Sequence, residues 1–256
     1  KRVAAIPEYT QRFKAAYDHL DTGNQIRFTD ISNAVASFIA LEWRSDTSPF
    51  DAYLRDPSIP LPPDADAGMK LFYGKAQCSA CHSGPFQTDH KFHAMAAPQL
   101  GPGKAAAFEN HARDTGRMRV TGDSADAYAF RTPSLRNVMQ TGPWGHAGGH
   151  NDMMRFLADH LDPSAALERF ADQGGARNGV SLPPLDVDDW REMDDANARA
   201  KIRNATEVKV PIVLDATEIA LLVSFLHSLD DPTALAGRMG IPPQVPSGLS
   251  VGGIGD

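Results

Sequence analysis

The residues with the clearest chemical potential are two cysteines and a histidine in the run Cys78-Ser-Ala-Cys81-His82. The pattern C-x-x-C-H is typical of c-type haem attachment. Each thiol can add to one vinyl group of a haem, and the adjacent imidazole then lies under the iron as its proximal ligand. We therefore predict one haem c, bound covalently through Cys78 and Cys81 and through the iron by His82.

Two other uses of this motif are a redox-active cysteine pair and a zinc site. A thioredoxin-like pair would lie at the start of a helix after a strand. Here an amphipathic helix is expected before the motif, and Ser83-Gly84-Pro85 follows it. A zinc site needs further ligands, and because the chain has only two cysteines these would have to be histidines. A zinc-binding structural domain is therefore the weaker alternative.

A cytochrome iron usually takes a sixth ligand from methionine or histidine. His160 lies on the apolar face of a helix predicted over about 151–161, one turn from Phe156 and Leu157. A lone histidine in that place can also be an ordinary core residue. The rival sulfur ligands, each of which could equally be plain core, are Met95, Met139, Met153 and Met154.

Composition sets the broad class of protein. The chain has 256 residues with 25 Lys and Arg against 32 Asp and Glu, a formal charge of −7. This acidic balance argues against non-specific binding to nucleic acid or to anionic membranes. A hydrophobic content of 42% allows a packed core, whereas 21 glycines and 19 prolines predict long irregular segments. No run approaches the roughly 18 apolar residues of a membrane span.

Helical spacing of apolar residues indicates the elements that must position the motif. Segments rich in proline and glycine separate the predicted helices. They are a linker over 56–64 and a region of long loops with a short hairpin over 83–128. An ordered loop over 130–138 is expected to lead to a short helix. Asp215 and Glu218 have the spacing of a capping box. The predicted helices are a first that ends before Asp21, a second that starts near Thr29, and helices over about 66–77, 151–161 and 217–229.

Several runs together resemble the bacterial diheme cytochrome c peroxidases and the MauG-like enzymes, which share one scaffold. The segment 28–54 is similar to the entry into that family's C-terminal haem domain, and the likeness extends over roughly residues 7–230. It implies a mainly α, cytochrome c-like haem domain with long irregular loops. The runs that carry it are Gly74–Phe86, Phe130–Asn137 and Thr141–Gly149.

The resemblance also assigns the haem ligands. Cys78 and Cys81 match the thioether cysteines, and His82 matches the proximal ligand. In the family the distal ligand follows a His-x-Gly-Gly turn and is Met in the peroxidases or Tyr in MauG-like enzymes. Counted from His146, that position is His160. The resemblance therefore implies a bis-histidine iron, which is lower in potential than a His/Met iron and suits a relay better than a peroxide site.

Further site residues follow from the same matches. Arg136 matches a residue that pairs with a haem propionate, although alone it would be a surface arginine. Trp144 and His146 match the loop that faces the other haem and are candidates for the electron relay, or else simply pack at a turn. The backbone carbonyls of Thr141 and Pro143 match calcium ligands, or else form an ordinary turn. His93 is interpreted as a surface histidine.

The chain has no second C-x-x-C-H, so we expect the peroxide-reactive haem and its catalytic acid to lie outside these residues. We expect that haem in an N-terminal haem domain or in a separate haem subunit. The expected domains are a helical segment over 1–55 at the end of such a domain, the haem domain over 56–236, and a Gly/Pro-rich, extended tail over 237–256.

The expected function is relay of electrons from a donor protein to a peroxide-reactive haem. The donor would be a small cytochrome c or cupredoxin, and hydrogen peroxide would react at the partner haem. The alternatives are MauG-like oxidation of a partner protein and a stand-alone, low-potential monohaem electron carrier. Because haem c is attached outside the cytoplasm, we expect a periplasmic protein.

Overall fold

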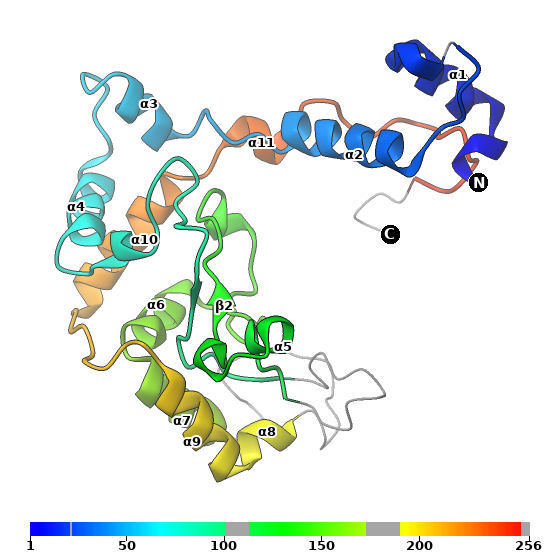
Figure 1. The fold of residues 1–256 in the computed structure, drawn as a ribbon. Helices are drawn as coiled ribbons and strands as arrows, with labels where there is room; N and C mark the ends of the chain where they lie inside the picture. The colour runs from blue at the N-terminus through cyan, green and yellow to red at the C-terminus, as the bar shows by residue number, and fades with distance from the viewer. Residues whose placement is uncertain (21, 101–112, 173–189, 252–256) are drawn as a thin grey trace. The chain divides into compact units, whose positions relative to one another are not determined.

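A computed structural model describes residues 1–20, 22–100, 113–172 and 190–251. The fold is mainly α, as predicted (Figure 1). Within the described residues, the only strand pairing is the short antiparallel ladder of β1 (Phe92–His93) and β2 (Phe130–Arg131). Contacts divide the chain into one unit over Ser48–Asp230 and another that combines Lys1–Thr47 with Asp231–Asp256.

The terminal unit contains α1 (Pro7–Ala16), α2 (Phe28–Glu42) and α11 (Pro232–Ala236). The first predicted helix ends earlier than expected, because Tyr17 has extended backbone angles. Leu20, which the predicted helix would include, lies instead in a separate 3-10 turn.

Two buried carboxylates hold this unit together. Asp231 caps α11 and accepts hydrogen bonds from the backbone N–H groups of Asp46 and Thr47, both at 2.7 Å. Glu42 accepts from the N–H groups of Arg238 and Met239, at 3.0 and 2.6 Å. The beginning of the C-terminal tail is therefore bound to the end of α2. Over residues 237–251 the tail has no helix or strand, in agreement with its high glycine and proline content.

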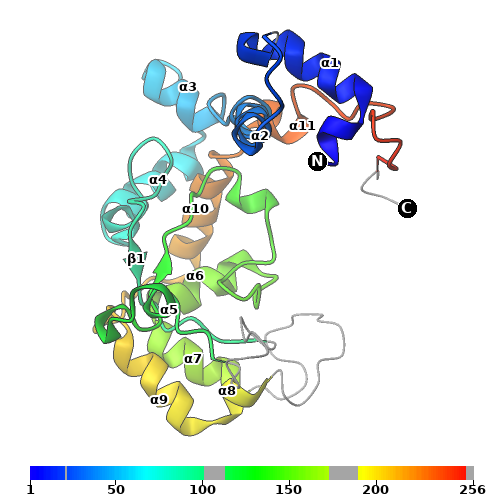
Figure 2. The same ribbon diagram turned by 45° about the vertical axis from the view of Figure 1, so that its right-hand side comes forward.

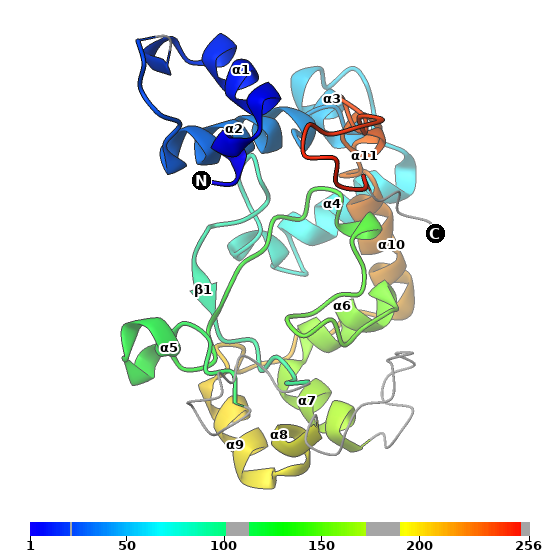
Figure 3. The same ribbon diagram turned by 90° about the vertical axis from the view of Figure 1, so that its right-hand side faces the viewer.

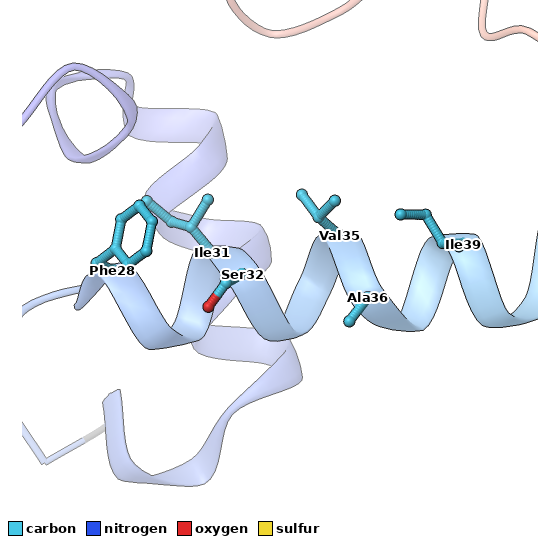
Figure 4. A pocket seen from close by; sticks show the side chains of 6 residues that line it. All are labelled: Phe28, Ile31, Ser32, Val35, Ala36 and Ile39. Atoms are coloured by element: carbon cyan, nitrogen blue, oxygen red, sulfur yellow. The ribbon is translucent and has the colours of Figure 1, made fainter. Parts of the chain in front are cut away.

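Helix α2 has the predicted apolar face, but this face is largely exposed. Val35 is 54% exposed and Phe38 is 43% exposed. The face forms an open hollow lined by side chains of α2 itself (Figure 4). The lining residues are Phe28, Ile31, Ser32, Val35, Ala36 and Ile39.

The larger unit is built on α4 (Pro63–Tyr73) and α10 (Ala216–His227), which lie side by side in Figures 1 and 2. They approach so closely that a Cβ on Gly68 would lie 1.9 Å from the carbonyl oxygen of Leu221. The short helix α3 (Pro49–Arg55) adds Phe50 to the same core. The core residues are Phe50, Leu61, Ala65, Phe72, Ala76, Met153, Leu222, Phe225, Leu226 and Leu229.

The boundaries of α4 differ from the predicted 66–77. The helix starts at Pro63, because a proline in the first turn lacks only an N–H group that has no helical partner there. It ends at Tyr73, where Gly74 leaves the helical conformation. The predicted linker is therefore shorter, and a non-helical segment separates the helix from Cys78.

A second core lies between helices that follow α6 (Met153–Leu161). They are α7 (Pro163–Asp172), α8 (Arg191–Asp194) and α9 (Ala196–Ala205), which are grouped below α6 in Figure 3. Helices α7 and α9 were not predicted, and Pro163 lies in the gap between the helices predicted over about 151–161 and 217–229. It is in fact the first residue of α7. The buried side chains of this core are Ala96, Tyr128, Leu167, Phe170, Met193 and Ile202.

The loop regions follow the prediction in outline. The ordered loop after β2 leads to a 3-10 turn over Val138–Gln140. Part of the predicted long loop forms the short helix α5 (Met118–Thr121), and residues 101–112 lie outside the described structure. The hairpin is wider than expected, since β1 pairs with β2 across many intervening residues. None of the described helices combines the length and the apolar character needed to cross a bilayer.

Candidate haem site

The C-x-x-C-H motif forms a tight turn directly after α4. Residues Cys78–Ala80 make one turn of 3-10 helix, and the N–H groups of Cys81 and His82 both donate to the carbonyl of Cys78, at 3.3 and 2.9 Å. Both cysteines are free and partly buried. Burial raises the pKa of the Cys78 thiol to about 11 and also raises the pKa of Cys81. The motif thus presents two neutral thiols beside one imidazole.

The His82 imidazole is oriented by the loop that follows it. Its Nδ1 lies 3.1 Å from the carbonyl oxygen of Gln87, which can only accept, so Nδ1 carries the hydrogen. The lone pair is then on Nε2, the usual arrangement for a histidine that binds a metal. Burial lowers the pKa of His82 below its ordinary value, which also favours the neutral ring.

His160 lies in the last turn of α6, a helix capped at its start by Asp152. Burial is the main cause that lowers the pKa of His160 to about 4, so the ring is neutral at physiological pH. Among the described residues, neither ring nitrogen has a hydrogen-bond partner. A partly buried imidazole without a partner is an available donor for a metal.

The rings of His82 and His160 have a spacing that fits one metal ion between them. Their centres lie 6.4 Å apart, and the ring planes are tilted by 50°. A metal–imidazole bond is about 2 Å long, so two imidazoles on opposite sides of one ion have ring centres about 6 Å apart. The two cysteines and these two histidines therefore fit a covalently bound haem with two axial imidazoles.

The rival methionines have other surroundings. Met153 is buried in the first core, and Met139 packs against that core. Met154 is 41% exposed. Met95 is partly buried in the loop after β1.

Arg136 binds a carboxylate that the sequence did not single out. Its terminal nitrogens donate to both oxygens of Asp51 at 2.8 Å, and its Nε donates to the carbonyl of Pro85 at 2.7 Å. Each terminal nitrogen has a second hydrogen, so pairing with a haem propionate remains chemically open. The signal for Asp51 was present in the sequence, since Ser48 and Asp51 form a capping box at the start of α3.

Trp144 and His146 lie in one loop but have different partners. Trp144 Nε1 donates to the carbonyl of Val138 at 2.8 Å, and its indole packs against the first core. His146 Nε2 lies 2.8 Å from Asp114, and its ring stacks on Phe130 with centres 3.6 Å apart. Both side chains are therefore fixed in place.

Thr141 and Pro143 flank Gly142 in the turn that precedes this loop. The Gly142–Pro143 peptide bond is cis, and the Thr141 hydroxyl donates to the carbonyl of Val138 at 3.2 Å. Calcium binding by the two backbone carbonyls stays a prediction.

The interpretation of His93 as a simple surface histidine is wrong. Its two ring nitrogens lie 2.8 Å from Asp89 and 2.7 Å from Glu207. Burial alone would lower the pKa of His93, but hydrogen bonds to these carboxylates outweigh it and raise the pKa above its usual value. No local signal could have predicted this cluster, because Glu207 is 114 positions away from His93.

The same cluster bears on the zinc alternative. A possible metal-binding group consists of Cys81, Asp89 and His93. Each offers one ligand atom, and these three atoms lie within 4.8 Å of one another. Both nitrogens of His93 already have carboxylate partners, however, and thioether formation would consume Cys81. These contacts favour an internal ion pair over a zinc site.

Sequence reasoning also missed a buried group beside His160. Asp159 lies 3.3 Å from Nε2 of His150 and 2.7 Å from a guanidinium nitrogen of Arg169. These residues come from α6, from the loop before it and from α7. No spacing rule for metal ligands or caps would have brought them together.

Comparison with known proteins identifies related sequences. The sequence model of the family described as di-haem cytochrome c peroxidase matches residues 1–58. The chain is 31% identical over 262 residues to cytochrome-c peroxidase IdrP1 of Pseudomonas sp. strain SCT, in an alignment covering 91% of this chain and 58% of that protein. It is 34% identical to the methylamine utilization protein MauG of Methylorubrum extorquens, over 58% of this chain and 38% of MauG.

The fold points the same way. The crystal structure of the diheme peroxidase BthA from Burkholderia thailandensis superposes with a TM-score of 0.50 and 21% identity, over 79% of this chain and 49% of that one. The chain spans about half the length of the curated relatives it matches. By its sequence, the chain is a member of the diheme cytochrome c peroxidase and MauG family.

Proposed function

We propose that the chain holds the electron-relay haem of a peroxidase-like oxidoreductase. Cys78 and Cys81 would hold the haem covalently, and His82 and His160 would bind its iron. The observation that carries this proposal is the 6.4 Å spacing of the two ring centres, one from the motif and one from α6. The haem, when bound, supplies one-electron chemistry.

The protein's own side chains prepare a closed, electron-conducting site. The carbonyl of Gln87 keeps His82 in one tautomer, and burial keeps both imidazoles neutral. With His82 and His160 both bound, the iron would have no open position for peroxide, and two histidine ligands would give it a lower potential than a His/Met pair. Such a site passes electrons on and does not itself cleave peroxide.

The surrounding residues complete the proposed relay. Arg136 pairs with a haem propionate through the hydrogens that Asp51 and Pro85 do not use. Trp144 and His146 lie on the proposed route to the second haem. The backbone carbonyls of Thr141 and Pro143 would hold a calcium ion, whose hard charge suits oxygen ligands.

The proposed partners supply the rest of the reaction. Electrons enter from a small cytochrome c, a cupredoxin or a protein substrate, and leave to a peroxide-reactive haem in another domain or subunit. The exposed apolar face of α2 supports such a haem partner, because it belongs to the segment that matches the family model. Since haem c is attached outside the cytoplasm, we place the protein in the periplasm.

Replacement of the distal ligand tests the site directly. The ferric wild-type holoprotein is expected to be low-spin, to bind cyanide weakly and to lack the long-wavelength sulfur-to-iron band of a methionine ligand. His160→Ala should become high-spin and bind cyanide or imidazole readily. His227→Ala, on the exposed end of α10, is the matched control. A sulfur-to-iron band in the wild type, or an unchanged spectrum of His160→Ala, would refute the ligand assignment.

The single C-x-x-C-H motif also supports a simpler function as a stand-alone electron carrier. A native complex with two haems per copy of this chain and a high-spin iron that reacts with hydrogen peroxide would support the peroxidase. Oxidation of a co-purified protein by that iron would support the MauG-like alternative. One low-spin haem that is inert to peroxide would support the carrier. If mass spectrometry of the protein shows no haem adduct, the zinc-binding structural domain becomes the favoured alternative.

A further inference from the structure

The carboxylate next to the distal histidine joins three elements of the larger unit. Asp159 precedes His160 on α6, and its side chain is only 9% exposed. One oxygen lies 3.3 Å from Nε2 of His150, and the other accepts from Arg169 of α7 at 2.7 Å. The guanidinium of Arg155, one turn earlier on α6, lies 3.9 Å away. Because a carboxylate can only accept, His150 donates from Nε2.

The loop that contributes His150 is itself fixed. Trp144 and His150 exchange backbone hydrogen bonds of 2.7 and 3.1 Å. The His150 side chain is 7% exposed, and its Nδ1 has no partner among the described residues. Burial of an imidazole with an unsatisfied nitrogen costs free energy.

An aromatic side chain connects this group to the distal ligand. The ring of Phe156 packs against both histidines, with its centre 5.2 Å from that of His150 and 5.4 Å from that of His160. Successive side chains of an α-helix project about 100° apart, so a rotation of α6 that moves His160 also moves Asp159. Such a rotation would break the contacts of Asp159 with His150 and Arg169 and would shift Phe156 against His150.

We propose that Asp159, held by His150 and Arg169, is a positioning residue that fixes the rotation of α6 and so keeps the His160 imidazole directed at its ligand position. This inference rests on the proposed axial role of His160. The contacts of Asp159 would then determine how firmly His160 stays at the iron, and so how well other ligands are excluded from it. His150 and Arg169 act only through Asp159.

Cyanide binding to the ferric holoprotein measures this effect. A ligand that must displace His160 binds with an apparent affinity proportional to the fraction of molecules in which His160 is detached. Asp159→Asn removes the charge with little change of shape and should raise the cyanide association constant by about tenfold, equivalent to about 1.4 kcal/mol. Asp152→Asn is the matched control, because it makes the same change on the same helix and asparagine caps equally well.

A second variant keeps the test decisive if Asp159→Asn does not fold. Arg169 is 45% exposed, and Arg169→Gln removes only its 2.7 Å ion pair. It should raise cyanide affinity in the same direction by a smaller factor. In the double variant, Arg169→Gln should add little to Asp159→Asn, since both act on one contact.

The outcomes separate the positioning role from the ligand assignment. The positioning role is refuted if Asp159→Asn and Arg169→Gln bind cyanide as the wild type does, while His160→Ala binds it much more tightly. A lower melting temperature with unchanged cyanide affinity would also refute it, because the group would then be merely structural. If His160→Ala itself binds cyanide as the wild type does, both proposals fail.

Discussion

Helices α10 and α2 have similar apolar sequences but opposite environments. In α10 the buried side chains are Ile219, Leu222, Phe225 and Leu226. In α2 the only buried positions are Asp30 and Glu42, while apolar residues such as Val35 and Phe38 are exposed. Each helix lies in a different unit of the chain. Helical periodicity therefore reports which residues share a face and does not report whether anything covers that face.

The physical difference lies in what each helix contacts. Helix α10 packs against α4, where Gly68 allows close approach, and Phe225 contacts both Phe50 and Phe72. Helix α2 is held by its ends. Near its start Asp30 accepts from the N–H of Arg27 at 2.8 Å, and at its end Glu42 binds the tail. Polar contacts at the two ends thus fix α2 without covering its apolar side.

The largest effect is expected where α10 is most deeply buried. Phe225 is 0% exposed, and Phe225→Ala should reduce the free energy of unfolding by about 3–5 kcal/mol because it leaves a cavity. Phe38→Ala in α2 is the matched control and should change it by less than about 0.5 kcal/mol. Chemical unfolding measures both. Equal losses in the two variants would contradict the contrast between the helices.

The contact between α4 and α10 is expected to be the next most sensitive point. Gly68→Ala places a methyl group against the backbone of Leu221 and should destabilise the unit by about 1–3 kcal/mol. Ser32→Ala on the exposed side of α2 should be neutral or slightly stabilising, because alanine is the better helix former. Thermal unfolding measures both changes. A stable Gly68→Ala variant would mean that the two helices pack less closely than described.

Acid should weaken the anchor of α3 beside the first core. Burial raises the pKa of Asp51, but hydrogen bonds from Arg136 and Ser48 outweigh it, so the pKa lies below its ordinary value. A carboxyl group with a lowered folded-state pKa stabilises the fold above its unfolded pKa of about 3.9. This stability is lost as pH falls from there through the lowered folded-state pKa.

Asp51→Asn tests that pH dependence. The variant should lose less of its free energy of unfolding than the wild type when urea unfolding is compared at about pH 6 and pH 3, because it lacks this titration. It should also be less stable at the higher pH, since Arg136 loses its charged partner. Identical pH dependence in the two proteins would show that Asp51 has no such role.

The smallest effect on stability is expected on the exposed face of α2. Val35→Ser should change the free energy of unfolding by less than about 0.5 kcal/mol. It should nevertheless weaken association with the proposed haem partner, because it removes apolar contact area. Pull-down with the purified partner domain, beside Ser32→Ala as the control, measures this. A large loss of stability would show that the chain itself buries this face.

Local sequence determined the parts of the protein whose physics is local. The C-x-x-C-H motif lies within one turn, so its spacing alone predicts its chemistry. The capping box of Asp215 and Glu218 was also predicted correctly. Helix α7 was missed, because a proline such as Pro163 is compatible both with the end of one helix and with the first turn of the next.

Only the tertiary structure decided which distant side chains meet. Arg136 and Asp51 are 85 positions apart, and His93 reaches Glu207 across 114 positions. The pairing of His82 with His160, and the burial of Asp159 between α6 and α7, likewise depend on how the helices pack. Spacing along a chain encodes contacts within a helix or turn, whereas contacts between elements are set by the packing of the whole core.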